Sequence, residues 1–426
     1  MTVPARNGLS RRDYLRMAVA VGGASAISAC VDEQDDIDVP TGTDDDSLPE
    51  RQHAWDGFLE TDDDGNVQPP EHHVLVALSL EAKLDDGDGD SFDDARETVE
   101  TSLRTLERAY EWSNDGLLFT IGYTPSYFDR FDGELPEAVD LPEPEPLTVS
   151  EDPAFDEFDA VIHLASDHAD VVLRAEEALF GELEELNDEP VEDDLTGVFE
   201  RLDDHRRTGF VGEGLPAEHT DVGGVPDSVP EDAPFFMGFR SGFRESQATE
   251  DRVTIEAGPF AGGTTQQLSS MGIQLEVWFE QENHTQRVMK TFSPEHAEKD
   301  LVGEVGEALG ASSGLTDERI EATEADATNP GVVGHAQKAA RARENGNPLL
   351  LRRDFNTVDG DSPGLHFLSL QRELTEFRAV RDAMTGADLD VQTLNNGIMG
   401  YIFVDRRGNY LVPPRSHRSL PPASPE

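Results

Sequence analysis

A histidine and a pair of arginines have the residue types and the spacing that best suggest a reactive site in this sequence. His335 begins a helix-like run that extends to residue 344, and the breaker residues 345–348 (NGNP) end that run. Arg352 and Arg353 follow at the start of a predicted strand. If the breaker turns the chain back on itself, His335 and Arg352 face each other across a pocket. That arrangement would suit a cofactor held between them, although a single histidine more often has a structural role.

The first thirty residues predict export from the cytoplasm. Residues 10–15 (SRRDYL) have the twin-arginine export pattern, and a small, apolar run over residues 17–29 leads to Cys30. The run is too short and too rich in Gly, Ala and Ser to be a strong membrane span. We therefore predict that residues 1–29 are a signal peptide with a lipobox, and that a lipid on Cys30 anchors the protein to the outer face of the cytoplasmic membrane. The alternative is an ordinary N-terminal helix with an unrelated cysteine.

The acidic composition predicts a protein adapted to high salt. Lys and Arg total 33 against 89 Asp and Glu, which gives a formal net charge of −56. Such a surface repels nucleic acid, and its self-repulsion destabilises the compact state unless ions screen it. A calcium or cationic-ligand interpretation is weaker, because the charge is spread along the whole chain. Cys30 is the only cysteine, so the remaining chain has neither disulfides nor thiolate metal sites.

Hydrophobic periodicity predicts the same supersecondary unit twice. The first copy has the order β-α-β-β-α-β of a ferredoxin-like (split βαβ) unit, with strands at 73–80, 117–123, 158–165 and within 196–211, and helices at 93–112 and 169–186. The second copy has strands at 273–280, 348–355, 364–371 and 398–404, and helices at 294–309 and 373–384.

These elements predict an α+β fold of tandem ferredoxin-like units, of the dimeric α/β-barrel type. We expect an acidic, disordered tether at residues 30–70, an N-terminal unit at 71–215, a C-terminal unit at 216–414 and a tail at 415–426. The second copy contains a long insertion, residues 310–347, and the crossover between the units covers residues 216–263. Long segments of this kind are usually functional, so we expect the chemistry there.

An ordered set of short stretches across residues 117–414 resembles the dye-decolorising (Dyp-type) haem peroxidase family. The stretches, in chain order, are LLFTIGYTPSYFDRF at 117–131, FDAVIHLASDHADVV at 158–172, FFMGFRSG at 235–242, GHAQKAAR at 334–341, PLLLRRDF at 348–355, GLHFLSLQRELTEF at 364–377 and GYIFVDRRGNYLVPP at 400–414. The resemblance implies two ferredoxin-like units with one haem b per chain, held in the C-terminal unit. Together with the export signal and the acidity, it implies a haloarchaeal-like, exported lipoprotein member.

The resemblance also implies roles for individual residues. The histidine that matches His335 is the proximal ligand of the haem iron, and the arginine that matches Arg352 lies on the distal face, where peroxide binds. A neutral imidazole can coordinate ferric iron, and a permanently charged guanidinium can stabilise negative charge on the peroxide oxygens. The other expected haem contacts are Arg353, Gly238, Phe239, Leu365 and Phe367.

One position departs from the family. Its motif of glycine, two residues, aspartate and glycine is GFRSG here, so Ser241 stands where the distal aspartate should be. That aspartate is assigned to proton transfer in the family. A serine hydroxyl is too weak an acid for this role, although it could order a water molecule. Glu245 is the nearby carboxylate, and we expect Arg352 and Ser241 to be the catalytic residues.

The sequence therefore leaves three hypotheses for function. The first is an exported haem peroxidase that oxidises an organic donor with hydrogen peroxide. The second is a haem- or ligand-binding lipoprotein on the same fold, with weak or no peroxidase activity because Ser241 replaces the distal aspartate. The third is a cofactor-free structural or interaction domain, and a homo-oligomer is compatible with each of them.

Other candidate residues have simpler interpretations. His163 and His168 could bind a divalent cation, but a strand and a following helix cap explain them better. Strand alternation predicts that His366 faces away from Leu365 and Phe367. Trp278 and Tyr401 could relay electrons, although aromatic residues on strands usually belong to the core.

Overall fold

The computed structural model describes residues 39–43, 47–84, 90–131, 133–149 and 151–425. The predicted signal peptide, the lipobox and Cys30 lie outside the described residues. Within the described part of the chain, no helix has both the length and the apolarity needed to cross a membrane.

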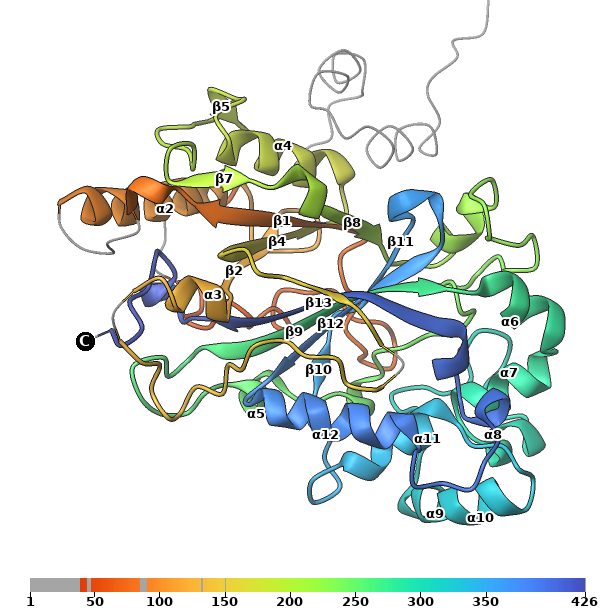
Figure 1. The fold of residues 1–426 in the computed structure, drawn as a ribbon. Coiled ribbons are helices and arrows are strands. Elements are labelled where there is room, and N and C mark those ends of the chain that lie inside the picture. Colours follow the sequence, from red (N-terminus) through yellow and green to blue (C-terminus); the bar gives the residue numbers. More distant parts are fainter. Residues whose placement is uncertain (1–38, 44–46, 85–89, 132, 150, 426) are drawn as a thin grey trace, which may run out of the picture.

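The N-terminal half forms one ferredoxin-like unit. Its four main strands pair in the order β8-β1-β4-β2, which places the first and third strands in the centre of the sheet. The elements are β1 (His72–Leu80), α2 (Asp90–Ala109), β2 (Leu118–Tyr123), β4 (Ala160–Ser166), α4 (Ala169–Leu179) and β8 (Arg207–Phe210). The apolar runs of the central strands are buried on both faces, because α2 and α4 cover one face and the second sheet covers the other (Figure 1).

The C-terminal half repeats the arrangement in the order β13-β9-β12-β11. Its elements are β9 (Thr264–Ile273), β10 (Leu351–Arg352), β11 (Phe355–Thr357), β12 (Gly364–Gln371), α12 (Leu374–Thr385) and β13 (Ile402–Val412). The two sheets join at single residue pairs, Tyr123 with Leu411 and Phe210 with Asn356, so that eight strands form a closed ring. The α+β fold of tandem ferredoxin-like units is therefore confirmed.

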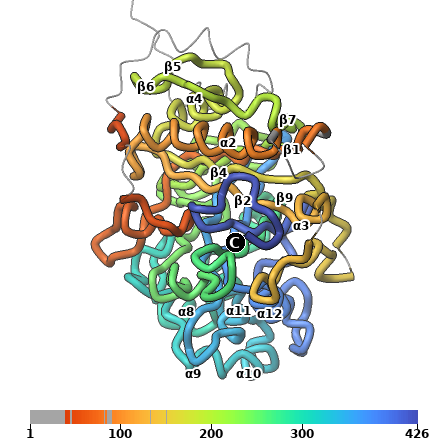
Figure 2. The backbone as a smooth tube through the Cα atoms, turned by 90° about the vertical axis from the view of Figure 1, so that its left-hand side faces the viewer, coloured from red at the N-terminus to blue at the C-terminus, as the bar shows by residue number. Residues whose placement is uncertain are grey.

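The remaining elements are short. They are α3 (Pro125–Phe128), β3 (Ala154–Phe155), β5 (Glu185–Leu186), β6 (Glu189–Pro190), β7 (Phe199–Arg201), α5 (Glu250–Val253), α6 (Leu275–Gln281), α7 (His284–Thr291), α8 (Pro294–Glu298), α9 (Asp317–Glu321), α10 (Thr323–Thr328) and α11 (His335–Ala339). Figure 2 shows α2 and α4 on one side of the sheets and α8 to α12 on the opposite side.

Two element predictions in the second unit are wrong. The strand predicted at 273–280 is the helix α6, whose buried residues Leu275, Trp278 and Phe279 have helical spacing. The true strand, β9, is rich in Thr, Gln and Ser and lacks an apolar pattern, yet β12 and β13 pair with both of its edges. The helix predicted at 294–309 ends at residue 298, and positive φ angles at Gly303 and Gly306 interrupt the segment that follows.

The prediction of a disordered tether is wrong for residues 47–70. Trp55 is 1% exposed, and its indole nitrogen donates to the carbonyl of Gln52. The side chain of Gln52 in turn accepts a hydrogen bond from the backbone nitrogen of Ile121. A few anchoring side chains therefore dock this acidic segment on the folded body, and their effect outweighs its local composition.

The C-terminal tail also packs on the N-terminal unit. Arg418 is fully buried and pairs with Glu100 and Glu107 of α2. The hydroxyl of Tyr123 donates to the carbonyl of Arg418 over 2.6 Å. The chain beyond residue 414 is therefore part of the fold of the N-terminal half.

Two buried histidines predict that acid lowers the stability of the folded protein. Burial lowers the pKa of His53 and of His73 to about 3, whereas an unfolded histidine has a pKa of about 6.5. Between these values the unfolded state binds more protons, so the free energy of unfolding falls as pH decreases below about 6.5. At about 1.4 kcal/mol per pH unit, each of these two histidines should remove about 2 kcal/mol of stability at pH 5.

Guanidinium chloride unfolding at pH 7.5 and pH 5, in molar salt that screens the acidic surface, measures this loss. His53→Gln should reduce the difference between the two pH values by about 2 kcal/mol. His168→Gln, which changes a partly exposed histidine, is the matched control. Equal free energies of unfolding at both pH values would contradict the prediction.

Candidate functional site

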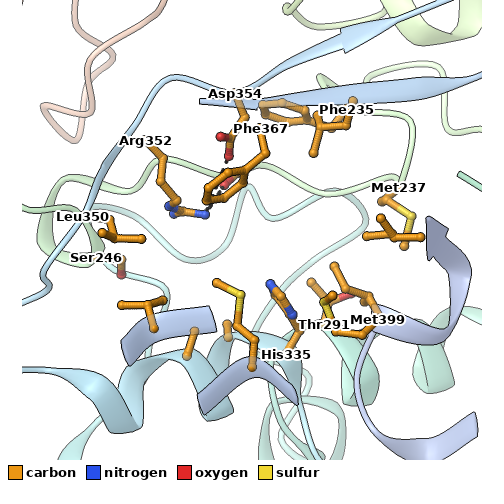
Figure 3. A pocket seen from close by; sticks show the side chains of 18 of the residues that line it. Phe235, Met237, Ser246, Thr291, His335, Leu350, Arg352, Asp354, Phe367 and Met399 are labelled. Atoms are coloured by element: carbon orange, nitrogen blue, oxygen red, sulfur yellow. Dashed lines mark hydrogen bonds and ion pairs between the residues drawn. The ribbon is translucent and has the colours of Figure 1, made fainter. Parts of the chain in front are cut away.

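A large, mostly apolar cavity lies on the outer face of the C-terminal sheet (Figure 3). Strands β10 and β12 and the loop at 235–243 form one wall, and α11 and α12 form the opposite wall. Its empty space, counted with the open mouth, is about 1680 Å³. The apolar lining includes Phe235, Phe239, Met271, Ile273, Leu350, Leu365, Phe367, Met384 and Met399.

The short helix α11 is fixed at both ends, and it carries His335 into the cavity. Gly334 precedes it, and a side chain at this position would overlap the carbonyl oxygen of Phe292, so only glycine allows this close approach. Gln337 accepts from the backbone of Gly334 and donates to the carboxylate of Asp326. The ammonium of Lys338 donates to the carbonyl oxygens of Met384 and Asn396.

His335 has two properties of a metal-binding imidazole, namely a place on the cavity wall and a neutral ring. Its ring points into the cavity from α11, and its Nδ1 atom is buried without a hydrogen-bond partner in the described part of the chain. Burial, followed by the nearby charge of Lys338, lowers the pKa of His335 to about 3, so the ring is neutral at physiological pH. A neutral imidazole can donate an electron pair to a metal ion.

Arg352 lies across the cavity from His335, as the sequence analysis expected (Figure 3). Its Nη1 atom donates to the hydroxyl of Ser241 over 3.2 Å. The side-chain amide of Gln247 pairs with both backbone groups of Arg352, at 2.9 and 3.0 Å, which holds the two-residue strand β10 in place. Gln247 thus positions Arg352, and no pattern in the sequence signals that role.

Asp354 is a cavity residue that the sequence analysis missed. Its side chain is 9% exposed, its Oδ1 atom accepts from the backbone nitrogen of Leu368 over 3.2 Å, and its Oδ2 atom lies 3.9 Å from Nη1 of Arg352. Burial raises the pKa of Asp354 to about 6. Alternation along the extended chain could have revealed it, because residues 352 and 354 must share one face.

Two predicted cofactor contacts do not line the cavity. Arg353 follows β10 directly and points away from the cavity: it donates to the carbonyl of His53 over 2.7 Å, and its guanidinium carbon lies 4.2 Å from the ring centroid of Trp55. Gly238 makes a turn with a φ of 89° behind the wall. Phe239, Leu365 and Phe367 do lie in the wall, and their contact with a cofactor stays a prediction.

The other sequence candidates lie outside the cavity. His366 faces away from it, as alternation predicted, and its Nε2 atom lies 3.2 Å from Asp359. Within the described residues, no group of three or more His, Cys, Asp and Glu side chains could hold a metal ion, so a cation site at His163 and His168 is not supported. Glu245 is exposed at the surface. Trp278 and Tyr401 pack against each other with ring centroids 4.9 Å apart.

A second, more polar cavity adjoins the first. It shares Arg240, Ser241, Arg352 and Asp354 with the apolar cavity, so the two meet at the end of Arg352. The docked segment 47–70 supplies part of its wall, including Asp56, Glu60 and Asp62. This polar cavity is therefore a route by which a small, hydrated molecule could approach Arg352.

Comparison with known proteins shows the fold. The model of the family of unknown function DUF7405 matches residues 70–414, and no curated protein matches the chain. A dye-decolorising protein from V. cholerae is 13% identical, with a TM-score of 0.52 over 85% of this chain and 97% of that one. The encapsulated DyP-type peroxidase from Mycobacterium smegmatis is 13% identical, with a TM-score of 0.54 over 84% and 97%.

A variant of DypB from Rhodococcus jostii RHA1, in complex with haem, is 13% identical, with a TM-score of 0.50 over 82% of this chain and 95% of that one. The chain thus has the fold of Dyp-type peroxidases over most of its length.

Proposed function

The chain belongs to the family of unknown function DUF7405, and we propose that it is an exported haem peroxidase that uses hydrogen peroxide to oxidise an organic donor. One observation carries this proposal. A neutral, unpartnered His335 and a cationic Arg352 occupy opposite walls of one apolar cavity, within the fold of Dyp-type peroxidases. The neighbour from Rhodococcus jostii, which binds haem on this fold, adds support.

The residues that line the cavity fit one haem b. His335 would ligate the iron, and the apolar walls would cover the porphyrin ring. Arg343 lines the same cavity and, within the described residues, has no carboxylate at ion-pair distance; its Nη1 atom donates to the carbonyl of Leu315. An unpaired guanidinium at the cavity wall would suit a propionate group. When bound, haem would accept the oxidising equivalents of peroxide and pass them to the donor.

The chain's own groups would prepare peroxide for cleavage. Arg352 carries a permanent positive charge at the junction of the two cavities, where it would attract peroxide and stabilise negative charge on its oxygens. Ser241, which accepts a hydrogen bond from Arg352, would help to hold the guanidinium in its orientation. The apolar walls would exclude bulk water, which strengthens these electrostatic interactions.

We propose that this enzyme works outside the cytoplasm, anchored by a lipid on Cys30 and adapted to high salt. The twin-arginine pattern at residues 10–15 and the net charge of −56 support this location. Export in the folded state would allow the haem to be inserted before the protein crosses the membrane.

One observation favours the second candidate, a haem-binding lipoprotein with little peroxidase activity. Ser241 cannot carry a proton in the way a carboxylate does. Purified full-length protein in high salt, produced with adequate haem, separates the candidates. A Soret band followed by a spectral change and donor oxidation after mixing with peroxide supports the peroxidase. A Soret band that peroxide leaves unchanged supports the haem binder, and absence of haem overturns both.

A further inference from the structure

Resting on the proposed peroxidase function, we propose that Asp354 is the catalytic acid–base residue that moves the proton of peroxide, in place of the carboxylate missing at Ser241. Asp354 lies beside Arg352 on the wall opposite His335 (Figure 3). It also lines the polar cavity, so its carboxylate is placed between the approach route and the apolar cavity.

The carboxylate is held in place but keeps one oxygen available. Oδ1 of Asp354 accepts from the backbone nitrogen of Leu368 in β12. Oδ2 makes no hydrogen bond to the described residues, and its nearest cation is Arg352, with Nη1 at 3.9 Å. The same Nη1 atom bonds Ser241, so the three side chains converge on one point of the wall.

Other carboxylates near Ser241 are less well placed than Asp354 to reach the cavity. Among the described residues that line the apolar cavity, Asp354 is the only one with a carboxylic acid. Glu245, the carboxylate nearest to Ser241 in sequence, has a side chain that is 61% exposed and lines neither cavity. The charged group nearest to Asp354 is Arg352 at the end of β10; Arg240 also lines both cavities, but its guanidinium pairs with Glu213.

The carboxylate of Asp354 takes one proton from the peroxide oxygen nearer to the cofactor and delivers it to the other oxygen. The O–O bond then breaks, and the protonated oxygen leaves as water with its original hydrogen. Haem held by His335 would supply the two electrons for this reduction and accept the remaining oxygen atom. Because burial raises the pKa of Asp354 to about 6, the group can both accept and release a proton near neutral pH.

Asp354→Asn tests the proposal, because it keeps the shape and removes the proton acceptor. In the haem-loaded protein, the rate constant of the reaction with peroxide should fall about 10²- to 10⁴-fold, while the Soret band persists. A second readout does not depend on turnover: association of cyanide, which must lose its proton when it binds as an anion, should slow as well. Glu245→Gln is the matched control and should change neither rate.

The wild-type protein supplies a test that needs no variant. After a rapid pH jump in high salt, the rate of the peroxide reaction should fall as pH decreases through about 6, because a protonated carboxyl cannot accept the proton. A flat profile between pH 5 and 7.5, or peroxide and cyanide rates of Asp354→Asn within threefold of wild type, would overturn the role of Asp354. Failure of the wild-type protein to bind haem would instead overturn the proposed function.

Discussion

The His335→Ala protein is expected to fold but to lose its haem, and with it the Soret band. His335 is the only histidine among the described residues that line the apolar cavity, so no other imidazole there can replace it. We expect the haem dissociation constant to rise at least about 100-fold, which corresponds to about 3 kcal/mol. Titration of apoprotein with haem, followed by absorbance, measures the change.

Two further measurements separate loss of the ligand from loss of the fold. Free imidazole should restore part of the haem spectrum in His335→Ala, because the substitution leaves space in the wall of α11. His168→Ala, which changes a partly exposed histidine outside the cavity, should bind haem as the wild type does. A His335→Ala protein that keeps stoichiometric haem with an unchanged spectrum would show that another group is the ligand.

Replacing Arg352 with leucine should leave haem bound but slow the reaction with peroxide about 10²- to 10³-fold. The expected loss, about 3 to 4 kcal/mol of transition-state stabilisation, is typical of removing one group that stabilises developing negative charge. Arg352→Lys should recover only part of the rate, since an ammonium lacks the planar fork that reaches Ser241 and faces Asp354 together. Stopped-flow mixing of the haem-loaded variants with peroxide measures each rate.

Arg244→Leu is the control for the charge effect. Arg244 directly follows the loop at 235–243 that carries Ser241. Its side chain is 55% exposed and lines neither cavity, so removing its charge should leave the rate of the peroxide reaction unaltered. If Arg352→Leu reacts with peroxide as fast as the wild type, Arg352 has no part in peroxide cleavage. The proposed arrangement of the distal wall would then be wrong.

The fold was predicted correctly where the order of apolar and polar residues within one strand or helix shows which of its sides is buried. The apolar run at 364–371 coincides with β12, and alternation along it correctly separated Leu365 and Phe367 from His366. The predicted meeting of His335 and Arg352 rested on local signals, a helix start and a breaker, together with the family resemblance of the stretches 334–341 and 348–355. These features depend on residues that are neighbours along the chain.

Other features depend on contacts between distant segments. Strand β9 has no apolar pattern because pairing on both edges, with β12 and β13, stabilises it. Trp55 belongs to the fold because the guanidinium of Arg353, about three hundred residues away, stacks on its ring. Because of the same contact, the side chain of Arg353 points away from the predicted cofactor site.

The sequence by itself determined the repeated α+β unit and the acidic character of the chain, and with the family resemblance it predicted that His335 and Arg352 face one cavity. Only the tertiary structure decided that Ser241 meets Arg352 and Asp354, because Ser241 comes from a segment more than one hundred residues away. The physical reason is that the spacing of apolar residues along a helix or strand shows only which of its sides is buried. The composition of a cavity wall is set by which elements pack together, and that packing arises only when the two units close into one ring of strands.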